Sequence, residues 1–214
     1  MPDRSGGQYR PGDSVVDVSR ETMERLQIVV AQLEKWQPKI NLVSPGTMTQ
    51  IWKRHILDSL QLLDCAQGAT QWLDVGSGGG FPGLVIASAL SEKAGAHVTL
   101  VESNAKKCAF LRETARLAGL PVEVVPQRIE QALPALSRPF DVVSARALAP
   151  LVDLLRLTEP VLSKGTLGLF PKGQDVDDEM KTATISWNFD ADLIESKTEP
   201  GAKVVVIKSA SRRL

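Results

Sequence analysis

Two spacings of hydrophobic residues divide the 214 positions of this chain into two regions. Over residues 19–38 apolar side chains recur at steps of three and four, which predicts an amphipathic helix that ends at a proline. A second helix with this spacing follows Pro45. Its Arg54 and Asp58 are four positions apart, so we expect them to pair across one turn. From Trp72 onward, short apolar runs alternate with helical patterns instead.

The second region is typical of a sheet with parallel strands. Five strands are expected at residues 71–75, 98–102, 122–126, 140–145 and 165–170, with helices at 83–90, 106–118, 129–133 and 151–162. Two further strands, 191–197 and 203–208, are separated by a short Pro-Gly turn and predict an antiparallel hairpin. Right-handed crossovers place helices on both faces of the sheet. The predicted fold class is therefore α/β, a seven-stranded, mostly parallel Rossmann-like sheet with an antiparallel terminal hairpin and an N-terminal helical extension.

These patterns divide a single domain into three segments. Residues 1–18 are polar and contain several glycines, which predicts a flexible tail. Residues 19–66 are expected to form helices packed on the core, and residues 67–214 the core itself. The N-terminus lacks the apolar stretch of a signal peptide, and no apolar run reaches the length of a membrane span. We therefore expect a cytoplasmic protein that does not associate with membranes.

Charge and cysteine content narrow the possible classes of function. Lys plus Arg and Asp plus Glu both number 25, so the chain lacks the basic excess usual for nucleic-acid binders. A local basic face is compatible with that neutral total. Cys65 and Cys108 lie far apart, and with His55 and His97 they do not form the closely spaced ligand set of a structural zinc site. No metal site is expected.

The most informative motif follows the first strand of the predicted sheet. Asp74 ends an apolar run, and Gly76, Gly78 and Gly80 follow at alternate positions before the helix that starts at Gly83. Glycines tolerate positive φ and let a ligand approach the bare backbone, while the start of the helix offers free N–H groups. The turn therefore predicts a binding site for a nucleotide-like cofactor.

Two acidic residues distinguish between the candidate cofactors. Glu102 ends the second strand, where a carboxylate can accept both ribose hydroxyls of an adenosine, as in NAD or S-adenosylmethionine. Asp74, placed before the glycines, would repel the pyrophosphate of NAD, whereas S-adenosylmethionine has no phosphate and carries positive charge. The pair favours S-adenosylmethionine, with an acidic rim around the site. A helix cap or turn residue is the alternative for Asp74.

Ligands of open parallel sheets bind beyond the carboxyl ends of the strands. Besides Asp74 and Glu102, those ends carry residues 127–130 after the third strand, Arg146 after the fourth and Lys172 after the fifth. Segments that are far apart in the sequence are thus expected to converge on one crevice.

Several segments together resemble one known family. They are Arg54-His55-Ile56-Leu57-Asp58-Ser59, the glycine segment from Asp74 to Gly83, Glu102-Ser103, Arg128-Ile129-Glu130, Ser144-Ala145-Arg146-Ala147 and Pro171-Lys172-Gly173. Over about residues 24–208 the chain resembles the glucose-inhibited division protein B family, the bacterial 16S ribosomal RNA guanine-N7 methyltransferases. The glycine turn is generic, but the first and fifth of these segments are specific. Residues 177–199 match only loosely.

The resemblance implies roles for individual residues. Gly76 and Phe81 would line the S-adenosylmethionine site, and Ile129 and Glu130 would bracket the adenine, largely through their backbone. Arg146 would reach either the cofactor or the incoming guanine. The alternatives are core packing for Phe81 and, for Arg146, a structural ion pair with Glu130 or Asp74.

The candidates for contact with RNA are Asn41, Arg54, His55 and Lys172. The last three have structural alternatives. Arg54 would otherwise be a helix-surface residue, His55 a core histidine and Lys172 a solvated loop charge. The implied partner is 16S ribosomal RNA or a small-subunit particle, and we expect a monomer.

The chemistry of guanine N7 agrees with the residues after the fourth and fifth strands. N7 carries a free lone pair and no proton, so its methylation needs no general base and depends mainly on alignment. No cysteine follows these strands, as a cytosine-C5 enzyme would require. Two alternatives stay open: a small-molecule methyltransferase on the same fold, and a non-catalytic RNA-binding module that retains the pocket.

Overall fold

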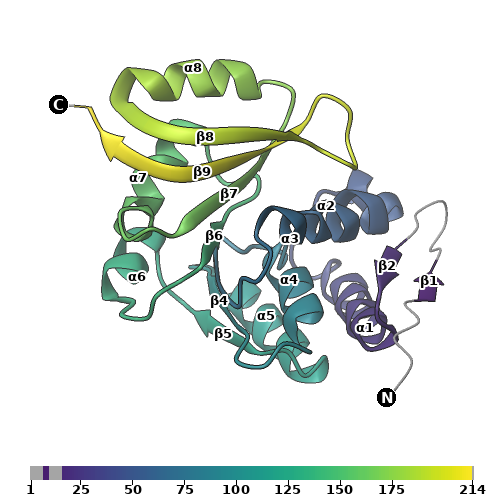
Figure 1. Cartoon of the computed structure of the whole chain (residues 1–214). Helices are drawn as coiled ribbons and strands as arrows, with labels where there is room; N and C mark the ends of the chain where they lie inside the picture. Colours follow the sequence, from purple (N-terminus) through teal and green to yellow (C-terminus); the bar gives the residue numbers. More distant parts are fainter. Residues whose placement is uncertain (1–6, 10–15, 214) are drawn as a thin grey trace.

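A seven-stranded sheet with helices on both faces forms the body of the molecule (Figure 1). The computed structural model describes residues 7–9 and 16–213. Across the sheet the strand order is β5-β4-β3-β6-β7-β9-β8, in which the first five strands are parallel and β9 is antiparallel to both neighbours. The strands are β3 (Gln71–Val75), β4 (His97–Val101), β5 (Val122–Val125), β6 (Val142–Ser144), β7 (Leu167–Lys172), β8 (Trp187–Glu195) and β9 (Lys203–Arg212). The predicted α/β fold class and its terminal hairpin are confirmed.

The helices alternate with the strands as expected. They are α1 (Arg20–Trp36), α2 (Asp58–Leu60), α3 (Leu62–Cys65), α4 (Gly83–Leu90), α5 (Ala105–Leu117), α6 (Ile129–Ala135), α7 (Leu151–Leu162) and α8 (Val176–Ser186), with a 3-10 helix η1 (Pro45–Gln50) and a π-helix η2 (Trp52–Leu57). None of the described helices is both long enough and apolar enough to cross a bilayer.

Successive side chains of a strand point to opposite faces of the sheet, and this separates two hydrophobic clusters. Trp72 of β3 packs in a cluster with Leu26 of α1, Leu84 of α4 and Phe110 of α5. Its neighbour Leu73 belongs to the other cluster, which contains residues of α6, α7 and α8. The N-terminal helix α1 therefore extends the layer formed by α4 and α5, as Figure 1 shows.

The segment after Pro45 differs from the prediction. The single expected helix is divided into η1, η2, α2 and α3, and the i→i+5 bonding of η2 alters the face on which its side chains lie. The predicted pair of Arg54 and Asp58 is wrong. Instead, Arg54 Nη1 lies 2.7 Å from Glu199 Oε2, and Asp58 Oδ2 lies 3.3 Å from Arg146 Nη1.

Helix α8 was not predicted, because its sequence carries little hydrophobic periodicity. Only Val176 and Ala183 of this helix are buried. The helix packs on α7, and its Glu179 accepts a hydrogen bond of 2.6 Å from the backbone N–H of Leu151. Tertiary contacts rather than local pattern therefore account for α8.

Most of the segment predicted as a flexible tail, residues 1–18, lies outside the described residues. In its described part, β1 (Gly7–Tyr9) and β2 (Val16–Val18) pair as a short antiparallel ladder that the sequence did not predict. The division of the chain into a tail, N-terminal helices and a core stays a prediction.

A buried carboxyl lies at the centre of the sheet. Asp74 points to the same face as Trp72, beneath the start of α4, and is 1% exposed. Trp72 Nε1 donates to Ser144 Oγ at 2.9 Å, and this hydroxyl donates to Asp74 Oδ1 at 2.8 Å. Asp74 Oδ2 has no hydrogen-bond partner among the described residues. Burial raises the pKa of Asp74 from 3.8 to about 6.

We predict that Asp74 makes the folded protein less stable at neutral than at mildly acidic pH. Between pH 3.8 and about 6 its carboxyl is protonated when folded and ionised when unfolded, so stability falls as the pH rises through this window. The shift corresponds to about 3 kcal/mol. Urea unfolding of the wild type and of Asp74→Asn, from about pH 4 to about pH 8, measures this contribution. A difference between the two proteins that is constant with pH would contradict the prediction.

Candidate functional site

An open crevice of about 1240 Å³ lies beyond the carboxyl ends of the parallel strands. It is lined by the turns after β3, β4, β5 and β6, by the end of β7, by the N-terminal helices and by the turn of the β8–β9 hairpin. The predicted residues that line it are Gly76, Gly78, Phe81, Glu102, Ile129, Glu130, Arg146, Arg54, His55 and Lys172. The distant segments thus converge as expected.

Two predicted residues do not line this crevice. Asp74 lies behind the wall, because strand alternation turns its side chain inward beneath α4. It therefore does not form the acidic rim that the sequence predicted. Asn41 is exposed on the loop before η1, whereas its neighbour Leu42 is buried and lines the crevice.

The glycine turn has the conformation that its sequence requires. Gly76 and Gly78 have φ values of +68° and +53°, in the left-handed region that L side chains rarely adopt. A Cβ at Gly76 would approach Leu148 Cδ1 to 2.7 Å, whereas a Cβ at Gly78 would meet only the carbonyl oxygen of Gly76, at 3.7 Å. Gly78 therefore borders open space on the crevice side of the turn.

Glu102 connects the glycine turn to the helix after β4. Its Oε2 accepts a hydrogen bond of 2.9 Å from the backbone N–H of Gly78, and its Oε1 accepts one of 2.7 Å from the N–H of Asn104. Asn104 in turn caps α5. A carboxylate has about four lone-pair positions, so both oxygens retain acceptor capacity toward a ligand. The geometry is compatible with the ribose contact, which stays a prediction.

The start of α6 presents backbone at the crevice wall. Ile129 and Glu130 are its first two residues, and the first N–H groups of a helix have no partner within the helix. The preceding residue, Arg128, makes no side-chain cap. This arrangement suits recognition of a ring edge through backbone groups, as predicted for the adenine.

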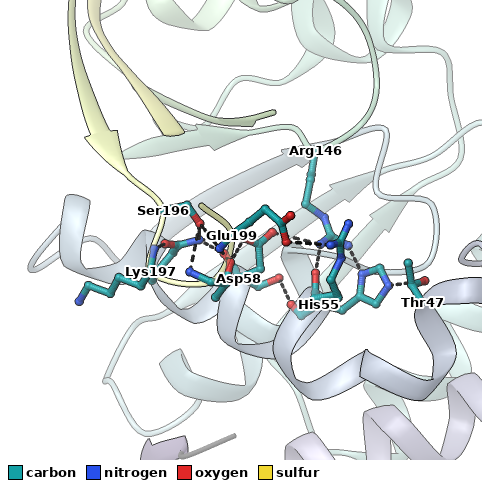
Figure 2. A network of polar contacts seen from close by, with 11 residues as sticks. Thr47, His55, Asp58, Arg146, Ser196, Lys197 and Glu199 are labelled. Carbon is teal, nitrogen blue, oxygen red and sulfur yellow. Dashed lines mark hydrogen bonds and ion pairs between the residues drawn. The ribbon is translucent and has the colours of Figure 1, made fainter. Parts of the chain in front are cut away.

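Arg146 is held by three groups from the N-terminal helices (Figure 2). Its Nη1 donates to the carbonyl oxygen of Arg54 at 2.8 Å and lies 3.3 Å from Asp58 Oδ2, while its Nη2 donates to His55 Nδ1 at 2.6 Å. The side chain is 15% exposed. Its ion-pair partner is thus Asp58, and not Glu130 or Asp74 as the structural alternative supposed.

His55 is a buried, neutral histidine that stacks on Phe81. An arginine only donates hydrogen bonds, so His55 Nδ1 accepts and the ring proton is on Nε2, which donates to Thr47 Oγ1 at 2.9 Å. The ring centres of His55 and Phe81 are 4.8 Å apart, and the central carbon of the Arg146 guanidinium, Cζ, lies 5.4 Å from the centre of the Phe81 ring. Burial, and then the charges of Arg146 and Arg54, lower the pKa of His55 to about 3. His55 is therefore a wall residue, not an exposed contact.

Arg54 and Lys172 are both tied to acidic residues. Arg54 pairs with Glu199 of the hairpin turn at 2.7 Å, and both side chains are exposed. Lys172 Nζ donates to the carbonyl oxygen of Ala149 and to Glu179 Oε2, each at 2.7 Å, and is 8% exposed. The buried Lys172 side chain pairs with the partly exposed Glu179 and connects β7 to α8. It is not the solvated loop charge that was its structural alternative.

Sequence reasoning missed Asp58 and the hairpin turn as parts of the site. Asp58 Oδ1 accepts from Thr198 Oγ1 at 2.7 Å and from Gln61 Nε2 at 2.9 Å, and Gln61 Oε1 accepts from the N–H of Lys197 at 2.9 Å. Asp58 thereby joins Arg146 to the hairpin (Figure 2). Its place in the specific 54–59 segment was the available signal, and no local signal existed for a partner 140 positions away.

Among the described residues, the groups beside Arg146 can bind and align a substrate, but none of them is a free base. His55 Nδ1 already accepts from Arg146, and a proton taken up by Asp58 would break its ion pair with Arg146. In the described part of the chain no cysteine lines the crevice, and no cluster of His, Cys, Asp and Glu is suited to a metal. The wall therefore suits a nucleophile that has no proton to lose.

Comparison with solved structures shows the fold. The SAH-bound methyltransferase of Podospora anserina has a TM-score of 0.61 and 14% sequence identity, covering 95% of this chain and 99% of that one. The ribosomal protein L11 methylase of Lactobacillus delbrueckii subsp. bulgaricus has a TM-score of 0.52 at 19% identity, covering 80% of this chain and 81% of that one. The Rossmann-like methyltransferase fold is confirmed.

Comparison with sequences shows the family. The family model described as rRNA small subunit methyltransferase G matches residues 22–205. The ribosomal RNA small subunit methyltransferase G of Methylorubrum extorquens (strain PA1) is 54% identical over 195 residues, covering 91% of this chain and 92% of that protein. The protein of the same name from Ruegeria sp. (strain TM1040) is 46% identical, covering 94% and 97%. The resemblance found in the sequence is confirmed, and the chain belongs to the rRNA small subunit methyltransferase G family.

Proposed function

We propose that this chain transfers a methyl group from S-adenosylmethionine to N7 of a guanine in 16S ribosomal RNA. Family membership carries the coarser statement that the chain is an S-adenosylmethionine-dependent methyltransferase of small-subunit ribosomal RNA. The choice of guanine N7 within that RNA, which the resemblance found in the sequence implies, is the finer part of the proposal.

The observation that supports N7 is the absence of a free base beside Arg146 in the described residues. A histidine with a pKa of about 3 that already accepts from Arg146 takes no proton from a substrate near neutral pH. Asp58 is the ion-pair partner of Arg146, and a proton on its carboxyl would break that pair. A ring nitrogen with a free lone pair needs no such base, and its methylation depends on alignment.

The cofactor side of the crevice fits S-adenosylmethionine. This cofactor supplies a methyl group bound to a positively charged sulfur. The open space at Gly78 leaves room for close approach to the backbone, the carboxylate of Glu102 offers acceptors to ribose hydroxyls, and the start of α6 offers backbone groups at Ile129 and Glu130. A crevice of about 1240 Å³ exceeds the size usual for a single small ligand, and so leaves space for a nucleotide beside the cofactor.

The RNA side requires basic groups that are free of acidic partners. Arg54 and Lys172 are paired in the described structure, whereas Lys107 and Arg128 line the crevice without an ion-pair partner among the described residues. We infer that Lys107 and Arg128 are phosphate contacts and that RNA affinity falls with salt. Arg54 would join them only after its ion pair with Glu199 opens.

Methylation of purified substrates tests the proposal. The protein and S-adenosylmethionine are incubated with naked 16S ribosomal RNA and with small subunits from cells that lack this protein, and the product nucleosides are identified by mass spectrometry. We expect N7-methylguanosine at one position. A methyl group on another atom or base would refute the N7 assignment, and methylation of small molecules alone would favour a small-molecule enzyme.

We predict that Gly78→Val weakens S-adenosylmethionine binding at least about tenfold, because the side chain would enter the open space beside the turn. Gly95→Val is the matched control, since Gly95 also has a positive φ, +75°, and has no neighbour within 4 Å. Isothermal titration and thermal unfolding of both variants separate loss of binding from backbone strain. Equal loss of affinity in the two variants, or tighter binding of NAD than of S-adenosylmethionine by the wild type, would contradict the cofactor site.

We predict that Arg146→Ala lowers the rate of methyl transfer at least about tenfold and lowers RNA affinity much less. Hydrogen bonds to charged groups contribute enough for such a loss, and phosphate contacts elsewhere retain the RNA. Arg146→Lys should not restore the rate, because lysine lacks the planar fork. Titration of S-adenosylmethionine without RNA shows which ligand Arg146 serves: weakened binding would assign it to the cofactor. Full activity of Arg146→Ala would remove it from the site.

A further inference from the structure

We propose that His55 and Asp58 are positioning residues that hold the Arg146 guanidinium in one orientation toward the target base. The inference rests on the proposed function, since it concerns the same site. It adds His55 and Asp58, which would affect the reaction only through the orientation of Arg146.

The hydrogen bonds of Arg146 leave one part of its guanidinium available. An arginine has five N–H donors. Arg146 uses Nη1 toward the Arg54 carbonyl and Asp58, and one Nη2 hydrogen toward His55. Among the described residues, its Nε–H and second Nη2 hydrogen have no partner, so these donors remain available to a ligand. The hydrogen bonds from Arg146 to Arg54, Asp58 and His55 form a clamp. This clamp therefore decides which donors of Arg146 a ligand meets.

The surroundings of Arg146 restrict its orientation further. Phe81 lies under the guanidinium, and His55 stacks on the same Phe81 ring, so both partners of this contact are fixed by packing. Ala147, the next residue, has a φ of 52°, a value that non-glycine residues rarely adopt. Leu148, the residue after it, lies close to Gly76 of the glycine turn. A strained backbone beside a clamped arginine indicates selection for geometry.

One orientation matters because of the chemistry of guanine. An arginine that meets the major-groove edge of guanine with two donors usually bonds both O6 and N7. A hydrogen bond to N7 would occupy the lone pair that forms the new bond to the methyl group. A guanidinium held in place by its other hydrogen bonds can donate to O6 while N7 stays free, whereas a mobile guanidinium could turn two adjacent donors to O6 and N7 together. The clamp would thus let Arg146 recognise guanine through O6 without blocking the N7 lone pair that accepts the methyl group.

Asp58 makes the clamp depend on the C-terminal hairpin. One carboxylate oxygen of Asp58 contacts Arg146 and the other contacts Thr198 in the hairpin turn.

The polar groups that face His55 are Thr47 of η1, Arg54 of η2 and Arg146 after β6. No carboxylate contacts the His55 ring in the described structure, so the ring stays a neutral acceptor.

Two substitutions of His55 separate the hydrogen bond to Arg146 from the rest of the ring. The Oδ1 atom of His55→Asn occupies the place of Nδ1 and can accept from Arg146. His55→Gln instead places its polar atoms near Nε2, toward Thr47. Both variants lose the stacking on Phe81, so a difference between them reports the hydrogen bond that Arg146 donates at the Nδ1 position. His97→Asn, at the chain's other described histidine, which pairs with Glu123 outside the crevice, is the control.

For each variant we measure the single-turnover rate of methyl transfer to the RNA, the affinity for S-adenosylmethionine and the thermal unfolding. We expect His55→Asn to stay within about threefold of the wild-type rate and His55→Gln to lose at least about tenfold, with equal affinities for S-adenosylmethionine. Equal rates for the Asn and Gln variants would overturn the proposal. A wild-type protein that does not methylate guanine N7 would instead refute the proposed function, and the two failures are thus distinct.

A double-mutant cycle tests whether His55 and Asp58 act through Arg146. In the Arg146→Ala protein, His55→Gln and Asp58→Asn should each change the rate by less than about twofold, because the group that they position is gone. In the wild type each should lower it at least about tenfold. Losses that multiply in the double variants would show that these residues act independently of Arg146, and would overturn the proposal.

Discussion

A nearly buried arginine determines how three parts of the chain meet. Removing a guanidinium from water is unfavourable unless its charge and its N–H groups find partners. Burial lowers the pKa of Arg146, and the adjacent Asp58 carboxylate opposes this shift. Because Asp58 and His55 belong to the N-terminal helices, the pairing holds these helices against the end of β6. Through Thr198, the same carboxylate also holds the hairpin turn.

Structural and binding roles coincide at several positions of the crevice. Glu102 holds the glycine turn and the start of α5 while it retains acceptor capacity toward a ligand. Lys172 and Glu179 attach α8 to the sheet at the crevice wall. Substitutions at these positions therefore affect both folding and binding, whereas Gly78 borders open space and separates the two effects.

Elements with strong local signals were predicted well. The strand Gln71–Val75 and the helices Gly83–Leu90 and Leu151–Leu162 have the predicted bounds, because clear apolar patterns and punctuating residues define them. The helix expected after Pro45 is broken, and α8 was missed, because packing against other elements decides both. Of the predicted site residues, those in strand-end turns line the crevice, whereas Asp74 and Asn41 do not.

The sequence alone determined the α/β fold class, the glycine turn and the family, since each depends on residues that are close together in the chain. It could not determine the partner of each charged side chain. Arg146 meets Asp58 across 88 positions, and Arg54 meets Glu199 across 145. Such pairs form only where elements cross in space, and burial then decides whether a charge needs a partner. The tertiary structure therefore decided that Arg146 is clamped and that Asp74 is hidden beneath α4.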